Sequence, residues 1–91
     1  RLFELSHLDI RRRLHAELLR AAGPPGPQGE RVISPPPLQQ ILAGRVGARR
    51  EPVSREIARL IREGTLARTR GALIIREPQA LELGLLSAVR G

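Results

Sequence analysis

The sequence predicts a small α+β domain: one helix, a short strand, a pair of helices, a β-hairpin and a closing helix. Apolar residues recur at helical spacing in separate segments, and the apolar runs between those segments are short enough to be strands. Glycine or proline stands near most of the junctions, where either residue ends a regular element. A length of 91 residues suits a single domain.

The first helix is expected to begin at Ser6 and to end at Gly23. Ser6 can cap the helix, and Asp9 places a negative charge in the first turn, where the helix dipole favours it. The apolar stripe of this helix is formed by Ile10, Leu14, Leu18 and Ala21.

The next segment, GPPGPQGE at 23–30, is rich in turn-forming residues and is predicted to be a linker. A short strand is expected at 31–34. Three prolines at 35–37 prevent the strand from continuing, because proline has no N–H to donate. A second helix is then expected at 37–46, with Leu38, Ile41, Leu42 and Val46 on its apolar side.

A third helix is expected directly after a glycine-containing turn at Gly47. Pro52 fits its first turn, where the missing N–H has no helical partner to lose. Gly64 ends the helix. One apolar stripe is formed by Val53, Ile57, Leu60 and Ile61, and the opposite face carries Glu51, Arg55 and Arg62. Two helices joined by such a short turn are typical of a helix-turn-helix, and the small Ala43 allows the pair to pack closely.

Two short strands are expected at 65–68 and 72–76, joined by a turn at 69–71. A hairpin that directly follows such a helix pair is called a wing. The run from Pro78 is predicted to be a closing helix, with Leu81, Leu85 and Leu86 packing inward. The order of elements is therefore that of a winged helix-turn-helix.

Composition restricts the function. The chain has no cysteine, so it has no disulfide, thiol nucleophile or cysteine-based metal site, which fits a cytoplasmic protein. Phe3 is the only aromatic residue, which argues against a base-stacking platform. The net charge of +7 attracts polyanions, although a basic surface without a partner has the same composition. No apolar run is long enough to span a membrane.

The third helix is the candidate for reading DNA bases. In this arrangement its N-terminal end enters the major groove, where arginine can pair with guanine and glutamate can accept from cytosine. The candidate base-reading residues are Arg50, Glu51, Ser54 and Arg55. Glu51 also stands four residues before Arg55, a spacing that allows an ion pair. The same residues also fit an ordinary ion-paired surface.

Other polar residues are candidates for contacts with DNA phosphates, which supply affinity but no sequence information. They are Arg49, Arg59, Arg68 and Arg70, with Gln39 and Gln40 at the start of the second helix. No enzyme is expected: His7 and His15 lack metal-ligand spacing, and no glycine-rich phosphate loop is present.

These segments resemble the DNA-binding half of the CRP/FNR (cyclic-AMP receptor protein and fumarate-nitrate regulator) transcription factors. The most specific match is LAxxxGxxRExVSR, which runs here from Leu42 to Arg55. The resemblance covers Leu8 to Leu83. It implies a winged-helix domain at 8–83, the end of an upstream dimerisation helix or hinge at 1–7, and a tail of the closing helix at 84–91.

The resemblance further implies a homodimer that binds double-stranded DNA at a TGA…TCA palindrome, with RNA polymerase as a further candidate partner. No cofactor is expected in the 91 residues. The chain begins with Arg1 and contains no methionine, so it is expected to be a piece of a longer protein. The ligand of the missing sensor domain stays open. Two other functions also stay open: a protein-interaction module and sequence-blind DNA binding.

Three positions depart from the family pattern. At the start of the second helix, Leu38 stands where the family usually has a Ser or Thr cap, and Ile41 stands where it usually has a glutamate. Arg49 stands where a serine often caps the third helix, the recognition helix that reads bases. The start of the second helix and its phosphate contact therefore stay open. For the third helix two alternatives stay open: a less well capped start, or a phosphate contact by Arg49.

Overall fold

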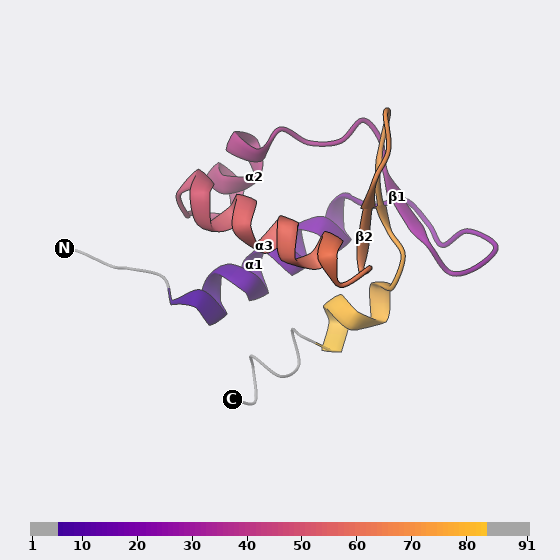
Figure 1. Ribbon diagram of the computed structural model, residues 1–91, viewed down its shortest axis with the longest axis horizontal. Coiled ribbons are helices and arrows are strands. Elements are labelled where there is room, and N and C mark those ends of the chain that lie inside the picture. Colours follow the sequence, from indigo (N-terminus) through magenta and orange to yellow (C-terminus); the bar gives the residue numbers. More distant parts are fainter. Residues whose placement is uncertain (1–5, 84–91) are drawn as a thin grey trace.

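The computed structural model describes residues 6–83, and its elements follow one another in the predicted order. They are α1 (His7–Ala21), β1 (Arg31–Ile33), α2 (Gln39–Val46), α3 (Arg50–Arg62), β2 (Leu66–Arg68) and β3 (Leu73–Ile75). Residues 78–83 are helical as well. The three long helices pack together at one end of the domain, and the small sheet stands at the other (Figure 1). The fold is an α+β winged helix-turn-helix, as the sequence predicts.

Helix α1 begins at the cap that the sequence predicts. The backbone N–H of Asp9 donates to Oγ of Ser6 at 3.1 Å, and the backbone N–H of Ser6 donates to Oδ2 of Asp9 at 3.3 Å. The bond from the Ser6 backbone is the main cause that lowers the pKa of Asp9 below its ordinary value. These reciprocal bonds satisfy donors that no helical carbonyl can reach.

The end of α1 differs slightly from the prediction: the helix stops at Ala21 rather than at Gly23. The chain is already extended at Ala22, and the N–H of Gly23 donates to the carbonyl of Val32 at 2.9 Å. Pairing with the segment around β1 therefore ends the helix earlier than its apolar stripe suggests.

The helix-turn-helix is formed by α2 and α3. Gly47 has the left-handed φ of 79° that allows the chain to leave α2, and Pro52 lies in the first turn of α3. The N-cap residues are Leu38 for α2 and Arg49 for α3, and neither side chain makes a capping hydrogen bond. Helix α2 begins two residues later than expected, at Gln39. The departures from the family pattern at these positions thus leave both helix starts without a side-chain cap.

The sheet has three antiparallel strands in the order β1-β3-β2. The hairpin of β2 and β3 is the predicted wing, although each strand is one or two residues shorter than expected. Strand β1 also ends one residue early, at Ile33, and its pairing with β3 was not predicted. Ile75 lies opposite both Arg31 and Leu66, so the wing is anchored on both sides of β3.

The core is aliphatic and draws on every element. Its buried members are Leu14, Leu18, Ile33, Leu42, Ala43, Val46, Val53, Ile57, Leu60, Leu66, Leu73, Ile75 and Leu81. Leu81 packs inward from residues 78–83, as expected. Leu85 and Leu86 lie outside the described residues. Within 6–83, no helix is long and apolar enough to cross a membrane.

Candidate nucleic-acid interface

The N-terminal end of α3 presents the predicted base-reading residues to solvent. Arg50, Glu51 and Arg55 are exposed, while Val53 and Ile57 on the opposite side of the helix are buried. The helix therefore directs charge outward and apolar side chains inward, as the sequence pattern predicts. Its first backbone N–H groups add partial positive charge at the same end.

Glu51 and Arg55 form the predicted ion pair across one helical turn. Nη2 of Arg55 lies 3.6 Å from Oε2 of Glu51, and the side chains of Arg55 and Glu51 are 66% and 82% exposed, respectively. Such an exposed contact contributes little to stability. Both side chains can therefore turn toward a ligand at small cost.

Ser54 has a more specific position than the sequence suggested. Its hydroxyl donates to Oε1 of Gln39, which is the first residue of α2. This bond joins the starts of the two helices, and it leaves Nε2 of Gln39 without a hydrogen-bond partner among residues 6–83. Two predicted contact residues are thus combined in one unit, in which Ser54 orients Gln39 and the amide nitrogen remains a donor.

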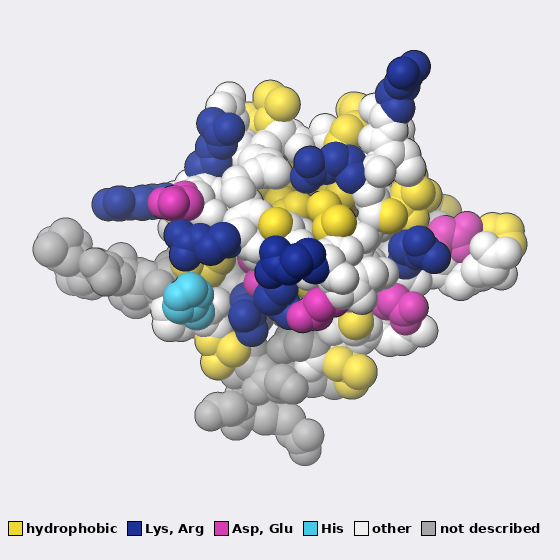
Figure 2. Space-filling view, viewed as in Figure 1, with side chains coloured by type: hydrophobic (Ala, Val, Ile, Leu, Met, Phe, Trp, Pro, Cys, Tyr) yellow, Lys and Arg dark blue, Asp and Glu magenta, His cyan; other side chains and the backbone are white. Residues whose placement is uncertain are grey.

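The remaining predicted phosphate contacts, apart from Arg59, lie around α3 and on the wing. Arg49, Arg68 and Arg70 are exposed, and so is Gln40 on α2. Arginine side chains lie along α3, at the end where α2 meets α3, and at the tip of the hairpin (Figure 2).

The wing tip is held in place by bonds of its own. Both the N–H and the hydroxyl of Thr69 donate to the carbonyl of Ala72, at 3.0 and 3.2 Å. The hydroxyl of Ser34 donates to the carbonyl of Gly71 at 3.0 Å. The exposed arginine at position 70 is therefore carried on an ordered turn.

A family model described as a Crp-like helix-turn-helix domain matches residues 12–83. The chain belongs to this family. Its match with solved structures extends over nearly the whole chain. The transcriptional regulator TTHA1359 of the CRP/FNR family from Thermus thermophilus is 26% identical, with a TM-score of 0.67 over 86% of this chain and 41% of that one. TTHB099, a CRP-family regulator from the same organism, is 25% identical, with a TM-score of 0.66 over 87% and 43%.

The CO-sensing protein from R. rubrum shares the fold, with 24% identity and a TM-score of 0.68 over 85% of this chain and 37% of that one. This Crp-like chain thus spans about two-fifths of the length of these structures. No curated protein matches it significantly. TTHA1359 and TTHB099 are transcriptional regulators, in agreement with the expectation that the domain is not an enzyme.

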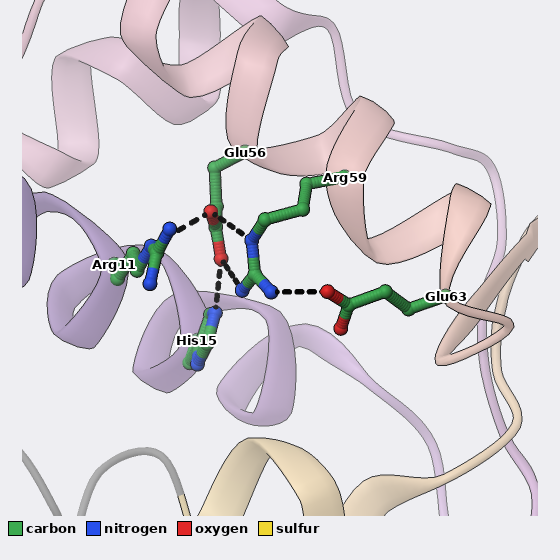
Figure 3. A network of polar contacts seen from close by, with 5 residues as sticks. All are labelled: Arg11, His15, Glu56, Arg59 and Glu63. Atoms are coloured by element: carbon green, nitrogen blue, oxygen red, sulfur yellow. Dashed lines mark hydrogen bonds and ion pairs between the residues drawn. The ribbon is translucent and has the colours of Figure 1, made fainter.

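The Crp-like domain also contains a polar network that the sequence did not reveal. Glu56 is buried on the inner side of α3, and four basic contacts converge on its carboxylate (Figure 3). Nε2 of His15 lies 2.7 Å from Oε2, and Nε of Arg11 lies 3.2 Å from Oε1. Arg59 donates to both oxygens, at 2.9 and 2.6 Å.

The environment of Glu56 keeps its carboxylate ionised. Burial alone raises the pKa, but the hydrogen bonds from Arg59 and His15 outweigh it and hold the pKa at about 2, against an ordinary 4.5. The same contact is the main cause that raises the pKa of Arg59 above its ordinary value. A charged carboxylate is tolerated inside the domain because donors surround it.

Arg59, a predicted phosphate contact, binds two carboxylates in the folded domain. All three of its guanidinium nitrogens donate to carboxylates, since Nη1 contacts Glu63 at 2.8 Å and the other two contact Glu56. Its geometry gives no support to a phosphate contact. His15 is buried and His7 is exposed. Within 6–83, no three His, Cys, Asp or Glu side chains cluster as metal ligands.

One feature of the sequence could have indicated this network. Glu56 stands three residues after Val53 and four before Leu60, which places it beside the apolar stripe of α3. A carboxylate at such a position needs buried donors. His15 follows Leu14 on the inner face of α1 and is the partner that this reasoning could have found.

Proposed function

We propose that this domain binds double-stranded DNA in a sequence-specific manner, as the DNA-binding part of a transcription regulator. Helix α3 enters the major groove of a half-site that contains TGA. Arg50, Glu51 and Arg55 contact base edges, and Ser54 assists by orienting Gln39. Backbone phosphates are contacted by Gln39, Arg49, Arg68 and Arg70.

The observation that carries this proposal is the arrangement of α3. Three charged side chains stand exposed at its N-terminal end, while the opposite face is fixed in the core by Val53 and Ile57. Base reading requires this combination, because a side chain discriminates bases only if the helix that carries it is held rigidly. Each bidentate pair with the right base contributes about 1–3 kcal/mol of discrimination.

The exposed arginines on the wing and before α3 supply the second part of the proposal. Each arginine that neutralises a phosphate releases a counterion, so the affinity falls as salt rises. Two domains in a homodimer of the longer protein would engage two half-sites one DNA turn apart. Each domain alone is expected to bind more weakly. RNA polymerase is the further partner expected of an activator.

The alternative from another class is a protein-interaction module. It requires an exposed apolar surface in place of the charged end of α3. The exposed large apolar residues within 6–83 are spread over several elements: Leu8, Val32, Leu38, Ile41 and Leu83. Among these five residues, only Leu38 and Ile41 lie one helical turn from each other. This distribution favours the DNA proposal.

A fluorescence anisotropy titration tests the proposal. The chain is titrated against a duplex with a TGA…TCA palindrome and against a scrambled duplex, each at several salt concentrations. Arg55→Ala is measured alongside, with Arg62→Ala as the matched control. Arg62 is an exposed arginine in the last turn of the same helix, so its loss changes the net charge equally without touching the reading end.

Tighter binding to the palindrome that Arg55→Ala abolishes and Arg62→Ala preserves supports base reading by α3. Equal, steeply salt-dependent binding to both duplexes indicates phosphate attraction alone, or a different half-site. If neither duplex binds at low salt, the DNA proposal is wrong for this chain and a protein partner becomes the leading alternative.

A further inference from the structure

The buried carboxylate of Glu56 joins two helices that the proposed function requires in a fixed relation. Its donors come from both sides: Arg11 and His15 belong to α1, and Arg59 belongs to α3 itself (Figure 3). The side chains of His15 and Glu56 are 6% and 5% exposed, so water does not replace these bonds. Within the described residues, this is the one buried ion-paired carboxylate.

The position of Glu56 on α3 couples its contact with α1 to the direction of Arg55. Glu56 directly follows Arg55, and about 100° of helix rotation separates the two side chains. Arg55 points to solvent, while Glu56 is held against α1. A rotation of α3 about its axis would therefore break the bond to His15 at the same time as it moved Arg55.

The apolar contacts of α3 fix this rotation less tightly. Apolar contacts are not directional, and cores tolerate changes in shape at moderate cost. A hydrogen bond at 2.7 Å between two buried groups, in contrast, permits little movement of either helix.

We propose that Glu56 is a positioning residue for DNA reading, which fixes the rotation of α3 through its bond to His15 of α1. This inference rests on the proposed function. It adds that base discrimination depends on a residue that touches no base. Because His15 of α1 is bonded to Glu56 of α3, a displacement of α1 must either move α3 or break this buried bond.

The test compares the affinities for the TGA…TCA duplex and its scrambled control in four variants of the chain. Glu56→Gln removes the charge. His15→Leu removes the buried donor of α1, whereas His15→Gln keeps a side chain that can donate. Ile57→Val is the control for destabilisation, because it trims a buried residue of α3 beside the network. Unfolding curves fix a temperature at which each variant is folded.

The palindrome preference is expected to fall by about tenfold in Glu56→Gln and His15→Leu, as in the loss of one base contact. His15→Gln and Ile57→Val are expected to keep it. If Glu56 acts by aiming Arg55, Arg55→Ala must also cost less preference in the Glu56→Gln background than in the wild type.

Three results would overturn the inference: an unchanged preference in both Glu56→Gln and His15→Leu, an equal loss in Ile57→Val, or additive effects of Glu56→Gln and Arg55→Ala. If Glu56→Gln does not fold, the pair of His15 variants decides alone. A wild-type chain without palindrome preference contradicts the proposed function instead, so the two failures are distinct.

Discussion

Nε2 of His15 lies 2.7 Å from Oε2 of Glu56, and this bond between α1 and α3 is buried. The two residues stand 41 positions apart in the chain. Arg59 donates to the same carboxylate from the next turn of α3. The contact between the first helix and the recognition helix therefore depends on charge as well as on apolar packing.

This contact predicts a specific dependence of stability on pH. The pKa of Glu56 is about 2 in the folded chain, below the ordinary 4.5. The folded state therefore favours the ionised carboxylate. Its contribution of about 3 kcal/mol is fully present above the ordinary pKa and is lost as the pH falls through the folded pKa. The difference in unfolding free energy between wild type and Glu56→Gln should shrink over that range, as measured by urea denaturation.

The exposed Glu51 provides the control for this measurement. Glu51→Gln removes a carboxylate that contacts only Arg55 at the surface. Its unfolding free energy should follow that of the wild type at every pH. A wild-type advantage over Glu56→Gln that stays constant as the pH falls to the folded pKa would contradict the assignment.

The sequence predicted most of the fold because the relevant signals are local. Ser6 and Asp9 form a cap across one helical turn, and Gly47 ends α2 directly after Val46. The exposed end of α3 followed from the helical period together with the family resemblance. Its ion pair between Glu51 and Arg55 also joins residues on neighbouring turns.

The missed features are contacts between distant segments. Strand β1 pairs with β3 from the far end of the chain, and so short a strand has no pattern that selects its partner. The bond between Gln39 and Ser54 joins two separate helices. Glu56 lies beside the apolar stripe of α3, but its partner His15 is 41 positions away, so their contact is visible only once α1 lies against α3.

Arg31 is predicted to stabilise the domain from outside the helices. Its guanidinium donates to the carbonyls of Gly23, Leu19 and Ala22, at 2.8, 3.0 and 3.1 Å, and so satisfies the C-terminal end of α1. Arg31→Ala should lower the unfolding free energy by about 1–3 kcal/mol. Arg31→Lys should recover only part of this loss, because an ammonium group lacks the planar fork. Urea denaturation measures both.

Arg76→Ala is the matched control for Arg31. Arg76 is an exposed arginine just after β3, the strand that pairs with β1, and its side chain makes no hydrogen bond within the described residues. Its loss removes the same charge and should change the stability little. Equal effects of the two alanine variants would show that charge, rather than capping, accounts for the loss.

Two glycines of the helix-turn-helix should respond in opposite directions to alanine. Gly47 has a φ of 79°, and an added Cβ would lie 3.3 Å from Nη1 of Arg13, so Gly47→Ala should destabilise by about 1–2 kcal/mol or more. Gly44 lies within α2, and an added Cβ meets nothing within 4 Å. Gly44→Ala should stabilise by about 0.5–1 kcal/mol. Thermal unfolding measures both, and shifts of the same sign would contradict the argument.

Replacing Arg49 with serine should raise the stability of the domain and lower its affinity for DNA. It is the N-cap of α3, its backbone is extended as a cap requires, and its side chain makes no capping bond. Arg49→Ser supplies a cap and removes a positive charge from the positive end of the helix dipole, so the unfolding free energy should rise by about 1 kcal/mol. If Arg49 contacts a phosphate, the dependence of log affinity on log salt should decrease in slope by about 1. Anisotropy titrations and urea denaturation measure the two effects, and Arg62→Ser should produce neither. A stabilised variant with an unchanged salt slope would remove Arg49 from the proposed DNA interface while leaving the capping argument intact.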